Sequence, residues 1–237
     1  MDKGINGVTA LGFGLEEYIK MFDLTDIELN MNILDCRAGA SCFAAQMHEQ
    51  SQVVVACDPL YRSEFDQIKH LVNAAKDSIQ NSFATSAQEF SILPEKAKEF
   101  MHQAETGIEI FFNDFPEGQK AGRYTGDSLP SLSFDDEQFQ LALVCHYLFT
   151  FSEQMSVEDH LNAIKELVRV SNEVRIFPLV TYGGQLSPYV GEVVAMLQNL
   201  SYGVEIRGVD YALQNQGNAM LRVWAESCSV DAHKTNQ

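Results

Sequence analysis

The spacing of apolar residues along the chain predicts alternating strands and helices. Leu15, Tyr18, Ile19 and Phe22 recur at helical spacing and predict a short amphipathic helix. The β-branched run from Val53 has no polar alternation, which is typical of a strand buried on both faces of a parallel sheet. Further strands are predicted over 32–35, 141–145 and 173–179, and a terminal hairpin over 204–209 and 220–225.

Helix signals follow the predicted strands. Small residues after the first strand turn the chain into a helix over about 42–49. The stretch 156–159 is a capping box and begins a second helix. Ser187 and Pro188 predict the N-cap and first position of a third, which Gly203 would close. The order of these elements predicts an α/β fold with a mostly parallel sheet.

The chain between Tyr61 and Arg123 is longer than a crossover needs, which is about 30 residues for a whole βαβ unit. Its periodicity is helical, so we expect a helical insertion over 62–122 within a single domain spanning 1–237. Gly107 weakens the last helical stripe, and 108–112 remains open as a short strand.

Composition narrows the class of protein. A hydrophobic share of 46% allows a real core, and the net charge of −17 disfavours nucleic acid and anionic membranes as partners. The five cysteines are odd in number, lack zinc spacing and are expected to be reduced thiols, so no metal site is predicted. The absence of a secretion signal or a membrane-length apolar run predicts a cytoplasmic protein.

Two acidic residues stand where predicted strands end. Asp35 precedes the small-residue loop 36–41, and such loops present backbone N–H groups at the carboxyl edge of a sheet, where α/β folds bind ligands. Asp58 lies nineteen residues beyond Gly39, the spacing of an acid that accepts hydrogen bonds from ribose hydroxyls. The pair indicates an adenosine-containing ligand.

These residues carry a family resemblance that covers most of the chain. Ile33-Leu34-Asp35-x-x-x-Gly39, Val55-Ala56-Cys57-Asp58 and the segment 126–144 resemble three motifs of class I S-adenosylmethionine-dependent methyltransferases. The resemblance implies a doubly wound, mostly parallel seven-stranded sheet with a C-terminal antiparallel hairpin. It also implies S-adenosylmethionine as cofactor.

The resemblance assigns parts of the cofactor to residues. The backbone from Cys36 to Gly39 would face the methionine part, Asp58 the ribose, Asp127 and Ser128 the adenine, while Cys145 and His146 would form the crevice floor. The implied cofactor-binding set is Tyr18, Asp35, Cys36, Arg37, Ala38, Gly39, Asp58, Pro59, Leu60, Tyr61, Asp127, Ser128, Leu129 and Cys145.

The chain departs from the family pattern in this loop. Arg37 and Ser41 replace two of the family's glycines, and Gln140 replaces an aspartate of the fourth-strand motif. The Arg37 side chain must turn outward or pair with the carboxylate of the ligand, or cofactor binding is weakened.

Each predicted site residue also has a structural alternative. Asp58 could form a turn before Pro59, Asp35 could hold the loop by its N–H groups, and Tyr61 could pack only on its own loop. Gly39 could be only a glycine at a helix start, and Asp127 and Ser128 could belong to an ordinary loop. Tyr18 and His146 could be core residues, and Cys36, Cys57 and Cys145 small buried hydrophobes.

The resemblance predicts methyl transfer to a small molecule. A catalytic base is optional, and His146 is the candidate because its ordinary pKa of about 6.5 suits proton removal near neutrality. Residues 145–148 lack the Asn-Pro-Pro-aromatic signature of the members that methylate base amino groups. Two alternatives remain: a non-catalytic binding module with a degenerate cofactor loop, and, more weakly, a nicotinamide-dependent oxidoreductase.

Overall fold

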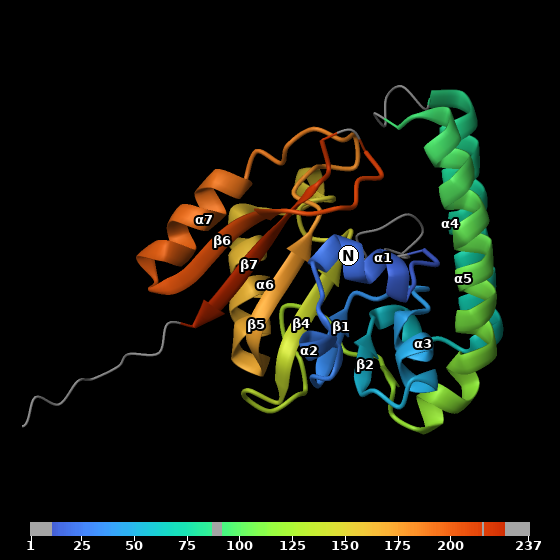
Figure 1. Ribbon diagram of the computed structural model, residues 1–237, viewed down its shortest axis with the longest axis horizontal. Coiled ribbons are helices and arrows are strands. Elements are labelled where there is room, and N and C mark those ends of the chain that lie inside the picture. Colours follow the sequence, from blue (N-terminus) through green and yellow to red (C-terminus); the bar gives the residue numbers. More distant parts are fainter. Residues whose placement is uncertain (1–10, 87–91, 215, 226–237) are drawn as a thin grey trace, which may run out of the picture.

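A single twisted sheet of seven strands forms the centre of the computed structural model, which describes residues 11–86, 92–214 and 216–225 (Figure 1). The strand order is β3-β2-β1-β4-β5-β7-β6. The strands are β1 Ile33–Cys36, β2 Val54–Cys57, β3 Tyr124–Thr125, β4 Phe139–Cys145, β5 Ser171–Phe177, β6 Tyr202–Gly208 and β7 Ala219–Ala225. All neighbours from β3 to β5 are parallel, and β7 is antiparallel to both β5 and β6. The predicted fold class is therefore confirmed.

Helices cover both faces of this sheet. They are α1 Leu15–Phe22, α2 Asp26–Leu29, α3 Phe43–Glu49, α4 Phe65–Ser86, α5 Pro94–Lys120, α6 Val157–Val170 and α7 Val190–Asn199, with short 3₁₀ helices at Pro59–Arg62 and Ser152–Gln154. In β4, Leu141 and Leu143 join the core formed with α1, α3, α4 and α5, while Ala142 and Val144 join the core formed with α6 and α7. Burial on both faces explains the unbroken apolar runs.

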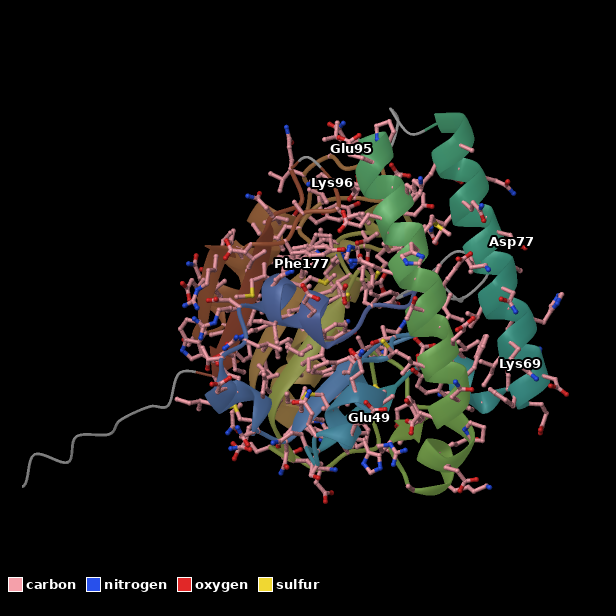
Figure 2. All side chains as sticks on the ribbon, turned by 45° about the vertical axis from the view of Figure 1, so that its right-hand side comes forward. Glu49, Lys69, Asp77, Glu95, Lys96 and Phe177 are labelled. Carbon is pink, nitrogen blue, oxygen red and sulfur yellow. The ribbon has the colours of Figure 1, made fainter. Side chains whose placement is uncertain are left out.

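The segment predicted to be an insertion contains α4 and α5, which lie side by side along one edge of the molecule (Figure 1). In the turned view of Figure 2, Lys69 and Asp77 mark α4, and Glu95 and Lys96 mark the first turn of α5. None of the described helices combines the length and apolar character that crossing a membrane requires.

Helix α5 runs without a break through Gly107, so the alternative of a strand over 108–112 is wrong. A Cβ atom at Gly107 would lie 1.9 Å from the carbonyl oxygen of Gly12. The glycine is present because the backbone of α5 passes directly against the backbone of Gly12. Helix propensity alone indicates only that a glycine destabilises the helix.

Local signals placed one helix correctly and misplaced another. At α6 the capping box forms as predicted, with the Asp159 N–H donating to Ser156 Oγ at 3.1 Å and the Ser156 N–H to Asp159 Oδ2 at 2.8 Å. At α7 the helix begins at Val190, two residues after Pro188, so the predicted start is early. The Ser187 hydroxyl still accepts from the Tyr189 N–H at 3.3 Å, and it lies 2.6 Å from the Ser152 hydroxyl.

Gly203 does not close α7. The helix ends at Asn199, and Gly203 lies in β6 beneath Trp224, whose Cε2 atom would be 2.1 Å from an added Cβ. The two-residue strand β3 carries too little pattern to be predicted. Cys228 and the polar tail after Ala225 lie outside the described residues.

Candidate ligand site at the carboxyl edge of the sheet

The loop between β1 and α3 lies where the strands of the parallel part of the sheet end. The segment preceding α1 is tied to this loop, because the Gly12 N–H donates to Ala40 O at 3.0 Å and the Cys42 N–H donates to Phe13 O at 2.9 Å. All residues from Cys36 to Cys42 are buried. The loop that sequence reasoning assigned to the cofactor is thus packed between the sheet and the chain before α1.

Asp58 ends β2 and joins two loops. Its Oδ1 atom accepts from the Leu60 N–H at 2.8 Å, and its Oδ2 atom accepts from the Gly39 N–H at 3.2 Å. The side chain is fully buried. The turn-forming alternative is confirmed by the first contact, and the second shows that the nineteen-residue spacing brings Asp58 and Gly39 together. The ribose role stays a prediction.

Arg37 occupies the position of the family's first loop glycine. Its φ of 62° lies in the left-handed region, where glycine is favoured. The side chain is only 3% exposed, with Nε 3.9 Å from Asp58 Oδ2 and the guanidinium carbon 4.3 Å from the centre of the Tyr147 ring. The outward orientation considered from sequence is wrong: the side chain turns inward, beside Asp58 and over Tyr147.

Asp35 and Tyr18 form a buried pair beneath the loop. The Tyr18 hydroxyl lies 3.0 Å from both carboxylate oxygens of Asp35. Burial raises the pKa of Asp35 to about 7; the Tyr18 hydrogen bond opposes this rise and the neighbouring Asp58 charge adds to it. The Tyr18 ring stacks on Phe43 with centroids 4.3 Å apart. This pairing ties α1 to β1.

The Asp35–Tyr18 pair leaves no surface of Tyr18 for a ligand, because both residues are fully buried. The predicted cofactor contact of Tyr18 therefore has no support in this arrangement, and its alternative as a core residue is confirmed. One hydrogen-bond partner of Asp35 is Tyr18, which the sequence pattern does not indicate.

Tyr61 fixes the loop from the other side. Its hydroxyl donates to Gly39 O at 2.7 Å, and its ring lies among Phe111, Phe115 and Tyr124. Tyr61 thus joins α5 to the loop between β1 and α3, so the alternative of packing only on its own loop is wrong, and the adenine contact stays a prediction. Leu60 is also buried. The three cysteines are buried as well, as expected for small apolar core residues: Cys36, Cys57 and Cys145.

A polar cavity of about 360 Å³ opens beside Arg37. It is lined by Arg37, Pro59, Ser128, Leu129, Pro130, Tyr147, Met155, Asp159, Asn162 and Ala163. Its volume falls within the range of about 300–1,000 Å³ that is common for small-molecule sites. Four residues of the predicted cofactor set, Arg37, Pro59, Ser128 and Leu129, come together on its wall.

Asp127 does not line the polar cavity. Its Oδ1 atom accepts from the Ser133 N–H at 2.9 Å, which shapes the loop after β3. Sequence reasoning missed Tyr147, Asp159 and Asn162 as lining residues. Tyr147 had a usable signal, because it directly follows His146 at the end of a strand, whereas the two α6 residues resemble ordinary helix-surface positions.

A second, apolar cavity of about 80 Å³ lies on the other side of the segment after β4. It is lined by Leu11, Phe13, Ala75, Ile79, Phe83, Ile92, Phe100, His146, Thr150, Phe151, Tyr182, Leu213 and Gln214. His146 lines the apolar cavity and its neighbour Tyr147 lines the polar one. The segment beginning at His146 therefore separates the two cavities.

His146 is a half-buried, neutral imidazole. Its ring stacks on Phe13 with centroids 4.8 Å apart, and Nδ1 lies 3.2 Å from Cys145 Sγ. Burial lowers the pKa of His146 to about 3. The expected pKa near 6.5, on which its role as a base depended, is therefore wrong. His146 can accept a hydrogen bond but takes up a proton only weakly.

The polar cavity fits one end of S-adenosylmethionine better than the other. Pro59 and Leu129 provide apolar surface for a flat base, and Ser128 and Asn162 provide polar groups beside it. At the place where the ribose would meet Asp58, the Arg37 side chain lies beside Asp58, and the Asp58 carboxylate is fully buried. The described arrangement therefore accommodates an adenine group, and Arg37 restricts the ribose end.

The strand order and the antiparallel position of β7 define a class I S-adenosylmethionine-dependent methyltransferase fold. No protein-family model matches the chain. The uncharacterized protein MJ0045 of Methanocaldococcus jannaschii is 27% identical over 230 residues, which cover 92% of this chain and 96% of that protein.

Solved structures of methyltransferases also resemble the chain. A SAM-dependent methyltransferase of Methanosarcina mazei matches with a TM-score of 0.43 and 13% identity, over 85% of this chain and 98% of that one. A SAM-dependent methyltransferase from Aquifex aeolicus matches with a TM-score of 0.42 and 16% identity, over 88% of this chain and 92% of that one.

Proposed function

We propose that the protein binds S-adenosylmethionine at the carboxyl edge of its sheet and transfers the methyl group to a small molecule. The observation that carries this proposal is the polar cavity, where Arg37, Pro59, Ser128 and Leu129 meet from three separate loops. These residues were assigned to the cofactor from motifs far apart in the sequence. Their convergence on one cavity of ligand size supports a shared ligand.

The residues of the chain would hold and orient the two reactants. S-adenosylmethionine supplies a methyl group that is already activated on a sulfonium. The protein's task is then placement, which can supply about 7–11 kcal/mol of the barrier in well-oriented reactions. Pro59 and Leu129 would flank the adenine, and the segment of His146 and Tyr147 separates the polar cavity from the apolar one. Neutral His146 would accept a hydrogen bond.

Calorimetric titration with S-adenosylmethionine, S-adenosylhomocysteine and NAD tests the proposal. Wild-type protein should bind the first two compounds and not NAD. Ser128→Trp should abolish that binding by filling the polar cavity, whereas Ser133→Trp, an exposed position in the same loop outside the lining, should retain it. Absence of binding, or equal binding by both tryptophan variants, would overturn the assignment.

One observation favours a second candidate, a non-catalytic binding module. Arg37 and Asp58 are buried beside each other at the ribose end, with Arg37 in a left-handed conformation that costs free energy for a residue with a Cβ. Arg37→Gly separates the candidates. A large gain in S-adenosylmethionine affinity would favour a degenerate site closed by Arg37, and a loss or no change would favour a working site that uses it.

A further inference from the structure

The apolar cavity is built jointly by the insertion and the sheet edge. Ala75 and Ile79 come from α4, Phe100 from α5, His146 and Thr150 from the segment after β4, and Gln214 from the loop between β6 and β7. The inserted helices therefore enclose space directly above the strand ends. Because His146 lines this space and Tyr147 lines the polar cavity, the apolar cavity lies where a second reactant would meet the proposed cofactor.

Two polar groups on its wall have unused hydrogen-bonding capacity. Thr150 is only 8% exposed, and its hydroxyl has no hydrogen-bond partner among the described residues. A buried hydroxyl without a partner is costly, and such groups in native structures call for an explanation. His146 contacts Cys145 through Nδ1, and within the described chain no partner is recorded for Nε2. A ligand bearing one hydroxyl would satisfy these groups.

The other residues that line the apolar cavity disfavour a charged ligand. Among the residues that the structure describes, no Asp, Glu, Lys or Arg lines the cavity, and the imidazole is neutral because burial lowers its pKa. Burial of an ion without a countercharge is strongly unfavourable. The volume of about 80 Å³ is also small. Since a cavity of about 150 Å³ holds a benzene ring, a group of about four or five carbon atoms matches this space better.

We propose that the apolar cavity binds a compact, uncharged alcohol, whose hydroxyl pairs with Thr150 and His146 while its branched carbon body packs against Ala75, Ile79 and Phe100. The assignment of this cavity to the methyl acceptor rests on the proposed function. Binding of the alcohol itself does not require the cofactor. The test is therefore made on protein alone.

The experiment titrates protein carrying ¹³C-labelled isoleucine methyl groups with 2-methylpropan-1-ol, 2-methylbutane and isobutyrate. The alcohol should shift the resonances of Ile79 and Ile92 saturably and leave Ile164, in the core on the other face, unchanged. The hydrocarbon, which lacks the hydroxyl, is the reference from which the contribution of the hydrogen bond is measured. Isobutyrate should not bind.

Two variants make the test specific. Thr150→Val keeps the shape of the side chain and should weaken binding of the alcohol about fivefold relative to the hydrocarbon, the ratio that one net hydrogen bond provides. Ala75→Leu should fill the cavity and abolish binding of both. No saturable shift in wild type, equal binding of isobutyrate, or an unchanged preference in Thr150→Val would overturn the proposal. Alcohol binding by a protein that fails to bind S-adenosylmethionine would keep this site and remove only the methyltransferase assignment.

Discussion

Replacing Gly107 with alanine tests how closely helix α5 packs on the chain before α1, which lies against the loop between β1 and α3. In a free helix this change is favourable by about 1 kcal/mol. Here the new Cβ would lie 1.9 Å from Gly12 O and 2.6 Å from the Gly12 carbonyl carbon. Both atoms belong to backbone, so a helix or the segment must move. Overpacking of this kind typically costs about 1–3 kcal/mol.

The balance of these effects gives a net loss of about 2 kcal/mol, because contacts with backbone belong at the upper end of the usual cost. Urea unfolding of wild type and Gly107→Ala measures the loss. Gly191→Ala in α7 is the matched control, since nothing lies within 4 Å of its Cβ position. The control should be neutral or gain up to about 1 kcal/mol. Stabilisation by Gly107→Ala would refute the close packing of α5 on Gly12.

Three further predictions concern the residues around the loop and α6. The pKa of Asp35 is raised to about 7, so between pH 5 and pH 7 the folded protein keeps a proton on Asp35 that the unfolded chain has lost. The free energy of unfolding of wild type should therefore fall by about 2 kcal/mol relative to Asp35→Asn over this pH range. An equal pH dependence of the two proteins would contradict it. Tyr61→Phe should cost about 1 kcal/mol of unfolding free energy by removing the bond to Gly39 O, and an unchanged melting temperature would contradict it. Ser156→Ala should cost about 1 kcal/mol by removing the cap of α6, measured in the same way.

The fold was predictable where its causes are local. Helix α1 and the capping box of α6 depend on residues within one or two turns, and both were placed from the sequence. The start of α7 was placed two residues early, and the Ser187 hydroxyl contacts both the local Tyr189 N–H and Ser152, a residue 35 positions away. Gly107 and Gly203 likewise owe their presence to distant neighbours, Gly12 and Trp224. A sequence pattern does not show which backbone or ring passes a glycine.

The location of the candidate site could be predicted from the sequence, but the orientation and pKa of its side chains could not. Spacing brought Asp58 to Gly39, and Pro59 and Ser128 to one cavity, because strand ends meet at one edge of a parallel sheet. The direction of the Arg37 side chain depends on Tyr147 and Asp58, which lie in other loops. The low pKa of His146 comes from burial beside the Phe13 and Phe177 rings, which the sequence does not show, so the ordinary value was misleading.

A crystal structure of the protein soaked with S-adenosylhomocysteine tests the assignment of the polar cavity. The adenine should lie between Pro59 and Leu129, near Ser128, with the guanidinium of Arg37 displaced from the Tyr147 ring. Density for the ligand at another surface, or an unfilled polar cavity at saturating ligand with Arg37 unmoved, would contradict the proposal that this edge of the sheet binds the cofactor.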